Sequence, residues 1–102
     1  MAEESRSTLV TGASRGIGRA VAIRLGAMGH RVAVNYNSHP EDAEEVVETI
    51  RSAGGEAISV QGSVAEREQV EAMFSTTEEA YGPVQILVNN AGIIDDALIL
   101  RM

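Results

Sequence analysis

The chain has 102 residues and a formal net charge of -7, from fifteen acidic and eight basic side chains. This length suits one domain with a buried core, and the absence of cysteine excludes disulfides, a thiolate nucleophile and a cysteine-bound metal. The acidic balance disfavours nucleic acid and anionic membranes as partners.

The first predicted element is a short apolar strand at Thr8–Val10, followed directly by a glycine-rich turn. The turn runs from Thr11 to Gly18 with the spacing G-x-x-x-G-x-G. Glycine is needed where the backbone takes a positive φ or approaches a phosphate closely, and a helix that begins here points unpaired N–H groups at the anion. Three glycines alone fit an ordinary turn equally well, but the strand before them and the helix after them favour a dinucleotide-phosphate site.

An amphipathic helix is predicted from about residue 16 to about residue 28. It ends at Gly29, a residue suited to left-handed geometry after a helix. Its apolar positions keep a helical period and are Ile17, Val21, Leu25 and Met28. The following run Arg31–Tyr36 contains β-branched side chains and predicts a second strand, buried on both faces.

A second helix is predicted after Ser38, because Ser38-His39-Pro40-Glu41 has the pattern of a capping box with proline in the first turn. The apolar face of this helix comprises Ala43, Val46, Val47 and Ile50. The acidic residues of the same segment are expected on its exposed face; they are Glu41, Asp42, Glu44, Glu45 and Glu48. A third strand follows at Ala57–Val60.

A third helix is predicted after a second S-x-x-E pattern at Ser63 and Glu66, and Gly82-Pro83 ends it. Its apolar stripe comprises Val70, Met73, Phe74, Thr77 and Tyr81. A fourth strand is predicted at Val84–Val88.

The alternation of strands and helices predicts an α/β fold, a Rossmann-type parallel sheet with helices on both faces and the element order β-α-β-α-β-α-β. Helical connections between parallel strands are right-handed, and the expected strand order is 3-2-1-4. Ligands of such sheets collect at the carboxyl ends of the strands, which is where the glycine turn lies.

Arg15 indicates which dinucleotide the turn binds. A guanidinium beside the second glycine can pair with a ribose 2′-phosphate, although an arginine at a helix start can also simply be solvated. NAD-selective sites place an acidic residue about 20 residues after the turn, whereas this chain has Asn35-Tyr36-Asn37-Ser38 there. The combination favours NADP(H) over NAD(H) as the cofactor.

Other polar clusters do not indicate a site. His30 and His39 lie without the pattern of a third ligand, so no metal site is predicted there. Asp95 and Asp96 are read as helix-start carboxylates, which the helix dipole favours, in preference to a metal pair.

The segment Asn89-Asn90-Ala91-Gly92 after the fourth strand reads by itself as a polar turn. Together with Thr11–Gly18, it resembles the short-chain dehydrogenases/reductases, whose motifs T-G-x-x-x-G-x-G and N-N-A-G the two segments match. Within that family, Thr11–Ala20 and the segment from Ala91 to Met102 are most similar to the β-ketoacyl-acyl-carrier-protein reductases. A polyketide ketoreductase or another ketone reductase is the alternative.

The resemblance implies a complete set of residues for the adenosine half of the coenzyme. At the pyrophosphate and the 2′-phosphate it implies Gly12, Ser14, Arg15, Gly16, Ile17 and Gly18, with Asn37 near the 2′-phosphate. At the adenine it implies Ser63 and Val64. Under the adenosine ribose it implies Asn90, Ala91 and Gly92, while Asn89 ties neighbouring strands together.

The resemblance also implies the reaction, which is NADPH-dependent reduction of a β-ketoacyl thioester in fatty-acid or related synthesis. The substrate would be a small molecule or bound to an acyl carrier protein. The family uses a tyrosine with a lysine four residues later, but Tyr36 and Tyr81 are followed at that position by Pro40 and Gln85, and the chain has no lysine. No catalytic residue is therefore assigned within this chain.

Residues 1–102 are expected to be a partial dinucleotide-binding domain, the amino-terminal half of a doubly wound reductase, and inactive alone. A cytoplasmic location is expected, since no apolar run approaches the ~20 residues of a membrane span. The resemblance implies that the parent is a homo-oligomer, a tetramer. An uncovered strand edge predicts that the isolated chain self-associates. Two alternatives stay open: a non-catalytic NADP-binding or regulatory module, and an inert fragment.

Overall fold

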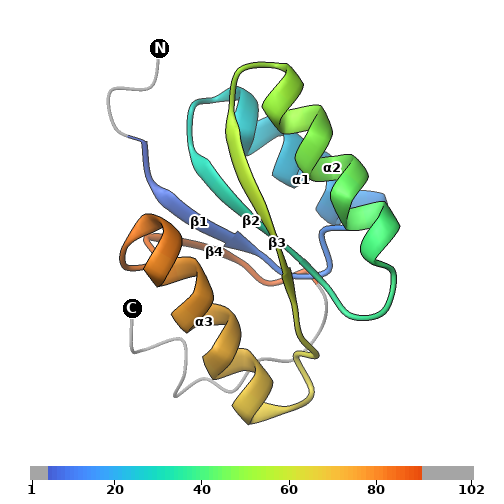
Figure 1. Cartoon of the computed structure of the whole chain (residues 1–102), viewed down its shortest axis with the longest axis vertical. Coiled ribbons are helices and arrows are strands. Elements are labelled where there is room, and N and C mark those ends of the chain that lie inside the picture. The colour runs from blue at the N-terminus through green and yellow to red at the C-terminus, as the bar shows by residue number, and fades with distance from the viewer. Residues whose placement is uncertain (1–4, 91–102) are drawn as a thin grey trace.

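Four parallel strands form the centre of the fold: β1 (Ser7–Val10), β2 (Arg31–Tyr36), β3 (Glu56–Gln61) and β4 (Ile86–Val88). Their order across the sheet is β3-β2-β1-β4 (Figure 1). The computed structural model describes residues 5–90, so the predictions for residues 91–102 lie outside the described part. The predicted α/β class, the alternation of elements and the strand order are confirmed.

Three helices cover the two faces of this sheet. α1 (Gly16–Ala27) and α2 (Pro40–Ser52) lie side by side on one face, and α3 (Arg67–Tyr81) packs on the other (Figure 1). This division follows from right-handed connections, because the chain steps one way from β1 to β3 and then returns past β1 to β4. The direction of winding therefore reverses between β1 and β4, which is where the ligand crevice of such sheets begins.

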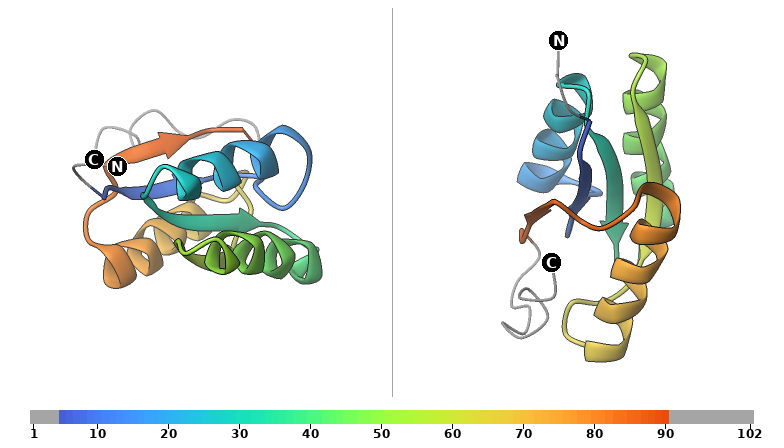
Figure 2. Two further views of the ribbon diagram at one scale, coloured as in Figure 1. Left: turned by 90° about the horizontal axis from the view of Figure 1, so that it is seen from above. Right: turned by 90° about the vertical axis from the view of Figure 1, so that its left-hand side faces the viewer.

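The register brings the carboxyl ends of β1 and β4 level with Val34 of β2, which continues to Tyr36. Val10 of β1 pairs with Val34 of β2 and with Val88 of β4. Seen from above in Figure 2, β4 lies at one edge of the sheet with β1 beside it. The residues directly after these three positions therefore meet at one edge of the sheet; they are Thr11, Asn35 and Asn89.

Separate apolar cores lie on the two faces. The core under α1 and α2 includes Val10, Val32 and Val34, whereas the core under α3 includes Leu9 and Ala33. Successive residues of β1 and β2 thus face opposite cores, as a central strand requires. The predicted apolar faces of α2 and α3 are confirmed, because every one of their residues is buried except Tyr81, which is half-buried.

The predicted apolar face of α1 is confirmed in part. Leu25 packs against the core under α1 and α2 and Val21 is half-buried, but Ile17 and Met28 are 75% and 48% exposed. The fully buried residues of the helix are the small ones, Gly18, Ala22 and Gly26, and a Cβ added at Gly26 would lie only 2.7 Å from Cγ2 of Ile50 in α2. Because small residues allow a close approach, tight backbone packing adds to the contacts of the larger side chains.

Both predicted capping boxes are also wrong. α2 begins at Pro40 after His39, and the Ser38 hydroxyl contacts Nδ1 of His39 at 3.2 Å. α3 begins at Arg67, while Oγ of Ser63 accepts a hydrogen bond from the N–H of Ala65 at 3.2 Å in the turn before the helix. Serine hydroxyls form such local turns as an alternative to capping.

The other ends of the helices and strands lie close to where the sequence predicts them. Gly29 and Gly82 end α1 and α3 with φ angles of 97° and 87°, as their positions predict. β4 is shorter than predicted, because its pairing with β1 begins only at Ile86. Among the helices of residues 5–90, none combines the length and the apolar character that crossing a membrane requires.

Candidate functional site

The glycine turn has the backbone geometry that its sequence predicts. Gly12 and Gly16 adopt positive φ angles of 60° and 62°, a region that side chains with a Cβ rarely occupy. Gly18 packs directly on the turn, because a Cβ there would lie 2.2 Å from the carbonyl oxygen of Gly12. The first turn of α1 is therefore pressed against the end of β1, with its N–H groups at the carboxyl edge of the sheet.

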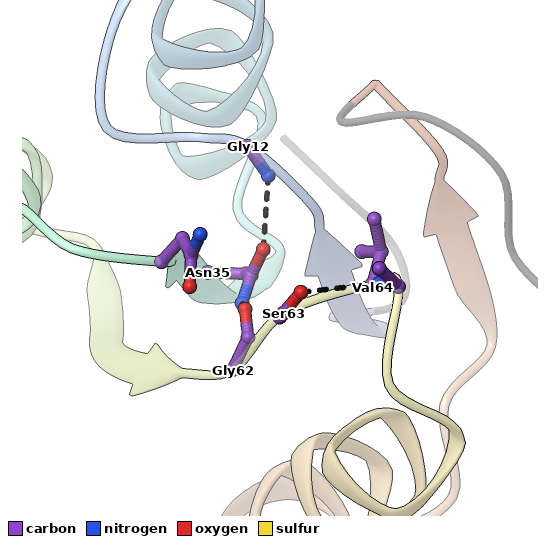
Figure 3. Close-up of a pocket in the computed structure, with 7 residues that line it drawn as sticks. Gly12, Asn35, Gly62, Ser63 and Val64 are labelled. Atoms are coloured by element: carbon purple, nitrogen blue, oxygen red, sulfur yellow. Dashed lines mark hydrogen bonds between the residues drawn. The ribbon is translucent and has the colours of Figure 1, made fainter.

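A buried asparagine fixes the turn from the β2 side. Asn35 is 2% exposed, and its Oδ1 accepts a hydrogen bond from the N–H of Gly12 at 3.0 Å (Figure 3). Its Nδ2 donates to the carbonyl oxygens of Val60 and Gly62, both at 3.1 Å. One amide group thus holds together the turn after β1 and the end of β3.

A second asparagine fixes the turn from the β4 side. Nδ2 of Asn90 donates to the carbonyl oxygen of Gly12 at 3.2 Å, and its backbone N–H donates to Oγ1 of Thr11 at 2.9 Å. The hydroxyl of Thr11 also lies 3.4 Å from Oδ1 of Asn89. The expectation that Asn89 ties neighbouring strands is met by this contact, and Asn90 makes a similar tie.

A cavity of about 270 Å³ opens beside the anchored turn. Its lining residues come from the turn after β1, the end of β2 and the segment after β3 (Figure 3), and they are Gly12, Asn35, Asn37, Gly62, Ser63, Val64 and Ala65. Four of the residues proposed from the sequence therefore share one cavity, namely Gly12, Asn37, Ser63 and Val64. The N–H of Ser63 is engaged by Oε1 of Gln69 at 2.8 Å, which fixes this segment of the wall.

The other predicted residues within residues 5–90 lie on or beside the glycine turn. Gly16 and Ile17 are exposed at the start of α1, Ser14 is half-buried, and Ala91 and Gly92 lie outside the described residues. Arg15 is exposed at the N-cap of α1, and its Nη2 lies 3.5 Å from Oδ2 of Asp42 in α2. The end of β2 and the two residues after it, residues 35–38, hold no carboxylate, but Asp42 of α2 brings one to Arg15.

Sequence reasoning missed the structural role of Asn35. It treated this residue only as a position without a carboxylate. The available signal was a single amide inside the apolar run Arg31–Tyr36, because a buried polar side chain has to find hydrogen-bond partners. The partners themselves, Gly12 and Gly62, could be identified only from the folded chain.

Tyr81 lies near the amino-terminal ends of the strands, whereas the glycine turn lies at their carboxyl ends. Its carbonyl oxygen accepts a hydrogen bond from Nη1 of Arg31 at 3.0 Å, and this guanidinium stands 5.7 Å from the centre of its ring. Burial raises the pKa of the Tyr81 phenol above its ordinary value, and the carboxylate of Glu56 raises it further.

Replacement of Asn35 tests the anchoring of the turn. Asn35→Ala is expected to destabilise the protein by about 2–3 kcal/mol, because it leaves the Gly12 N–H and two carbonyl oxygens without their buried partner. Urea denaturation of the purified natural polypeptide measures this loss. Asn37→Ala is the control, since Asn37 is exposed in the same segment and should change stability far less. Equal effects of the two substitutions would show that Asn35 is not the anchor.

The sequence matches a known protein family and several of its characterised members. The sequence profile of the family described as short chain dehydrogenase matches residues 6–102. The 3-oxoacyl-(acyl-carrier-protein) reductase FabG of Staphylococcus aureus is 47% identical over 98 residues, which cover 96% of this chain and 40% of that protein. A 3-oxoacyl-(acyl-carrier-protein) reductase of Synechocystis is 50% identical over 94 residues, covering 92% of this chain and 38% of the relative.

A solved structure shares the fold. The landomycin C-6 ketoreductase LanV, crystallised with NADP and rabelomycin, superposes with a TM-score of 0.80 and 40% identity, over 90% of this chain and 40% of that one. The chain thus spans about 40% of the length of each of these proteins. Because the family profile covers nearly the whole sequence, the chain belongs to the short-chain dehydrogenase family.

Proposed function

We propose that residues 1–102 are a partial dinucleotide-binding domain for NADP(H), and that the whole protein is an NADPH-dependent reductase of β-ketoacyl thioesters. The observation that carries this proposal is the anchored glycine turn beside a cavity at the carboxyl edge of the sheet. Two 3-oxoacyl-(acyl-carrier-protein) reductases among the relatives support the substrate class. The NADP bound in the landomycin ketoreductase supports the coenzyme.

The glycine turn is proposed to bind the two phosphate-bearing parts of the coenzyme. The backbone N–H groups at the start of α1 face the pyrophosphate, and the positive φ angles of Gly12 and Gly16 let the chain pass it without a Cβ in the way. Ser14, Ile17 and Gly18 complete this contact. Arg15 and Asn37 face the 2′-phosphate, where a guanidinium offers paired donors to an anion.

The cavity is proposed to hold the nucleoside. Ser63 and Val64 line the cavity and are proposed to contact the adenine. Asn90, Ala91 and Gly92 are proposed to bind the ribose. The cavity fits this role because it opens next to the turn and three strand ends converge on it. The ties from Asn35 and Asn90 keep its walls in place before the ligand arrives.

The proposed reaction converts a ketone to a secondary alcohol. NADPH, when bound, supplies a hydride for the carbonyl carbon, and a proton must reach the carbonyl oxygen. The family's Tyr-x-x-x-Lys pair for that proton does not occur in these 102 residues. The role proposed for this chain is therefore to bind and orient the adenosine half of the coenzyme, within a cytoplasmic homo-oligomer that takes free or carrier-bound substrates.

A second candidate is a non-catalytic NADP-binding module. The two candidates share the same coenzyme site and differ only in what else the natural polypeptide contains. Mass measurement of the intact natural polypeptide separates them, because the reductase requires a longer product that carries the pair.

The coenzyme preference can be measured by titrating the purified natural polypeptide with NADPH and NADH. NADPH is expected to bind more tightly, and Arg15→Ala should weaken NADPH binding by about tenfold or more while changing NADH binding little. Arg24→Ala is the matched control, since it removes one exposed positive charge from the far end of the same helix. NADH binding at least as tight as NADPH binding would contradict the proposed selectivity.

The reaction itself can be followed by the loss of NADPH absorbance. The natural polypeptide should oxidise NADPH when a short β-ketoacyl thioester is added, and much more slowly with a simple ketone that lacks the thioester. Replacing NADPH with NADH serves as the coenzyme control. Tight NADPH binding without turnover of any ketone would reject the reductase and support the non-catalytic module.

A further inference from the structure

The contact between Arg15 and Asp42 joins two elements at the proposed 2′-phosphate site. Arg15 is the N-cap of α1, and Asp42 lies in the first turn of α2. The distance between Nη2 and Oδ2 is 3.5 Å, and the two side chains are 64% and 44% exposed. The carboxylate therefore occupies one side of the guanidinium that is proposed to receive the phosphate.

This ion pair contributes little to the fold. Charge-assisted hydrogen bonds between nitrogen and oxygen are normally about 2.7–2.9 Å long, and ion pairs between exposed side chains add little to stability. Asp42 also has a second favourable interaction, because the amino-terminal turn of a helix stabilises a carboxylate. The pair can thus separate at little cost, and Asp42 remains stabilised when it does.

We infer that Asp42 is the place-holder for the coenzyme 2′-phosphate: it holds Arg15 in the free protein and yields the guanidinium when the phosphate binds. This inference rests on the proposed function, because it concerns the same arginine. The 2′-phosphate must displace the Asp42 carboxylate from Arg15, and it then remains close to that carboxylate. Asp42 therefore lowers the affinity for 2′-phosphorylated nucleotides and leaves nucleotides with a free 2′-hydroxyl unaffected, which makes it a determinant of coenzyme specificity.

The inference is tested with two small probes, 2′,5′-ADP and 5′-AMP, titrated calorimetrically into the purified natural polypeptide. Asp42→Asn should tighten the binding of 2′,5′-ADP by roughly two- to tenfold, the range expected for an exposed charge pair, and leave 5′-AMP unchanged. Glu41→Gln is the matched control, because Glu41 lies in the same helical turn and carries the same charge. It should change 2′,5′-ADP binding much less.

A double-substitution cycle separates displacement from simple repulsion. If Asp42 acts through Arg15, the gain from Asp42→Asn should fall to the level of Glu41→Gln when Arg15→Ala is also present. Equal effects of Asp42→Asn and Glu41→Gln, a gain that persists without Arg15, or a weaker complex after Asp42→Asn would each overturn the inference.

The same titrations distinguish failure of the inference from failure of the proposed function. A wild-type protein that prefers 2′,5′-ADP, with no gain in Asp42→Asn, keeps the coenzyme proposal and rejects the place-holder. A wild-type protein without that preference, which gains it in Asp42→Asn, rejects the proposed selectivity and supports the place-holder. If neither the wild-type protein nor the Asp42→Asn variant prefers 2′,5′-ADP to 5′-AMP, the proposed selectivity and the role of Asp42 are both rejected.

Discussion

The whole arrangement depends on how the peptide group of Gly12 is held. Its N–H donates to the buried amide of Asn35, and its carbonyl oxygen accepts from the amide of Asn90. The two asparagines come from opposite neighbours of β1, so the glycine turn is fixed between strands that are far apart in the sequence. Gly18 then seats α1 against the same carbonyl, and the start of the helix becomes part of the anchored unit.

The anchoring turns a flexible sequence into a preorganised binding surface. Glycine-rich segments lose much conformational entropy on ordering, and a ligand that had to order this one would bind less tightly. In this chain the loss of conformational entropy is offset during folding, by hydrogen bonds whose partners are buried or lie at strand ends. The cavity beside the turn has walls from three strand ends for the same reason, because Asn35 links the turn to the end of β3.

The sequence predicts the fold well because its signals are local, whereas the site depends on contacts that are not. Alternating apolar runs and glycine stops suffice for the strands and for the buried faces of α2 and α3, and the strand order then follows from the doubly wound fold class. The burial of Gly18, Ala22 and Gly26 in α1 could not be found from hydrophobicity, because these residues are small; Gly26, for example, packs against Ile50. The pairing of Arg15 with Asp42 links residues 27 positions apart, and the composition of either segment alone does not reveal it.

A crystal structure of the natural polypeptide grown with NADP+ tests most directly whether the anchored turn binds the phosphates of NADP(H). We expect pyrophosphate density against the backbone between Gly12 and Gly18, with the 2′-phosphate beside Arg15 and the Asn35 hydrogen bond to Gly12 intact. A well-ordered turn with no coenzyme density beside it, at saturating NADP+, would show that the turn does not bind these phosphates.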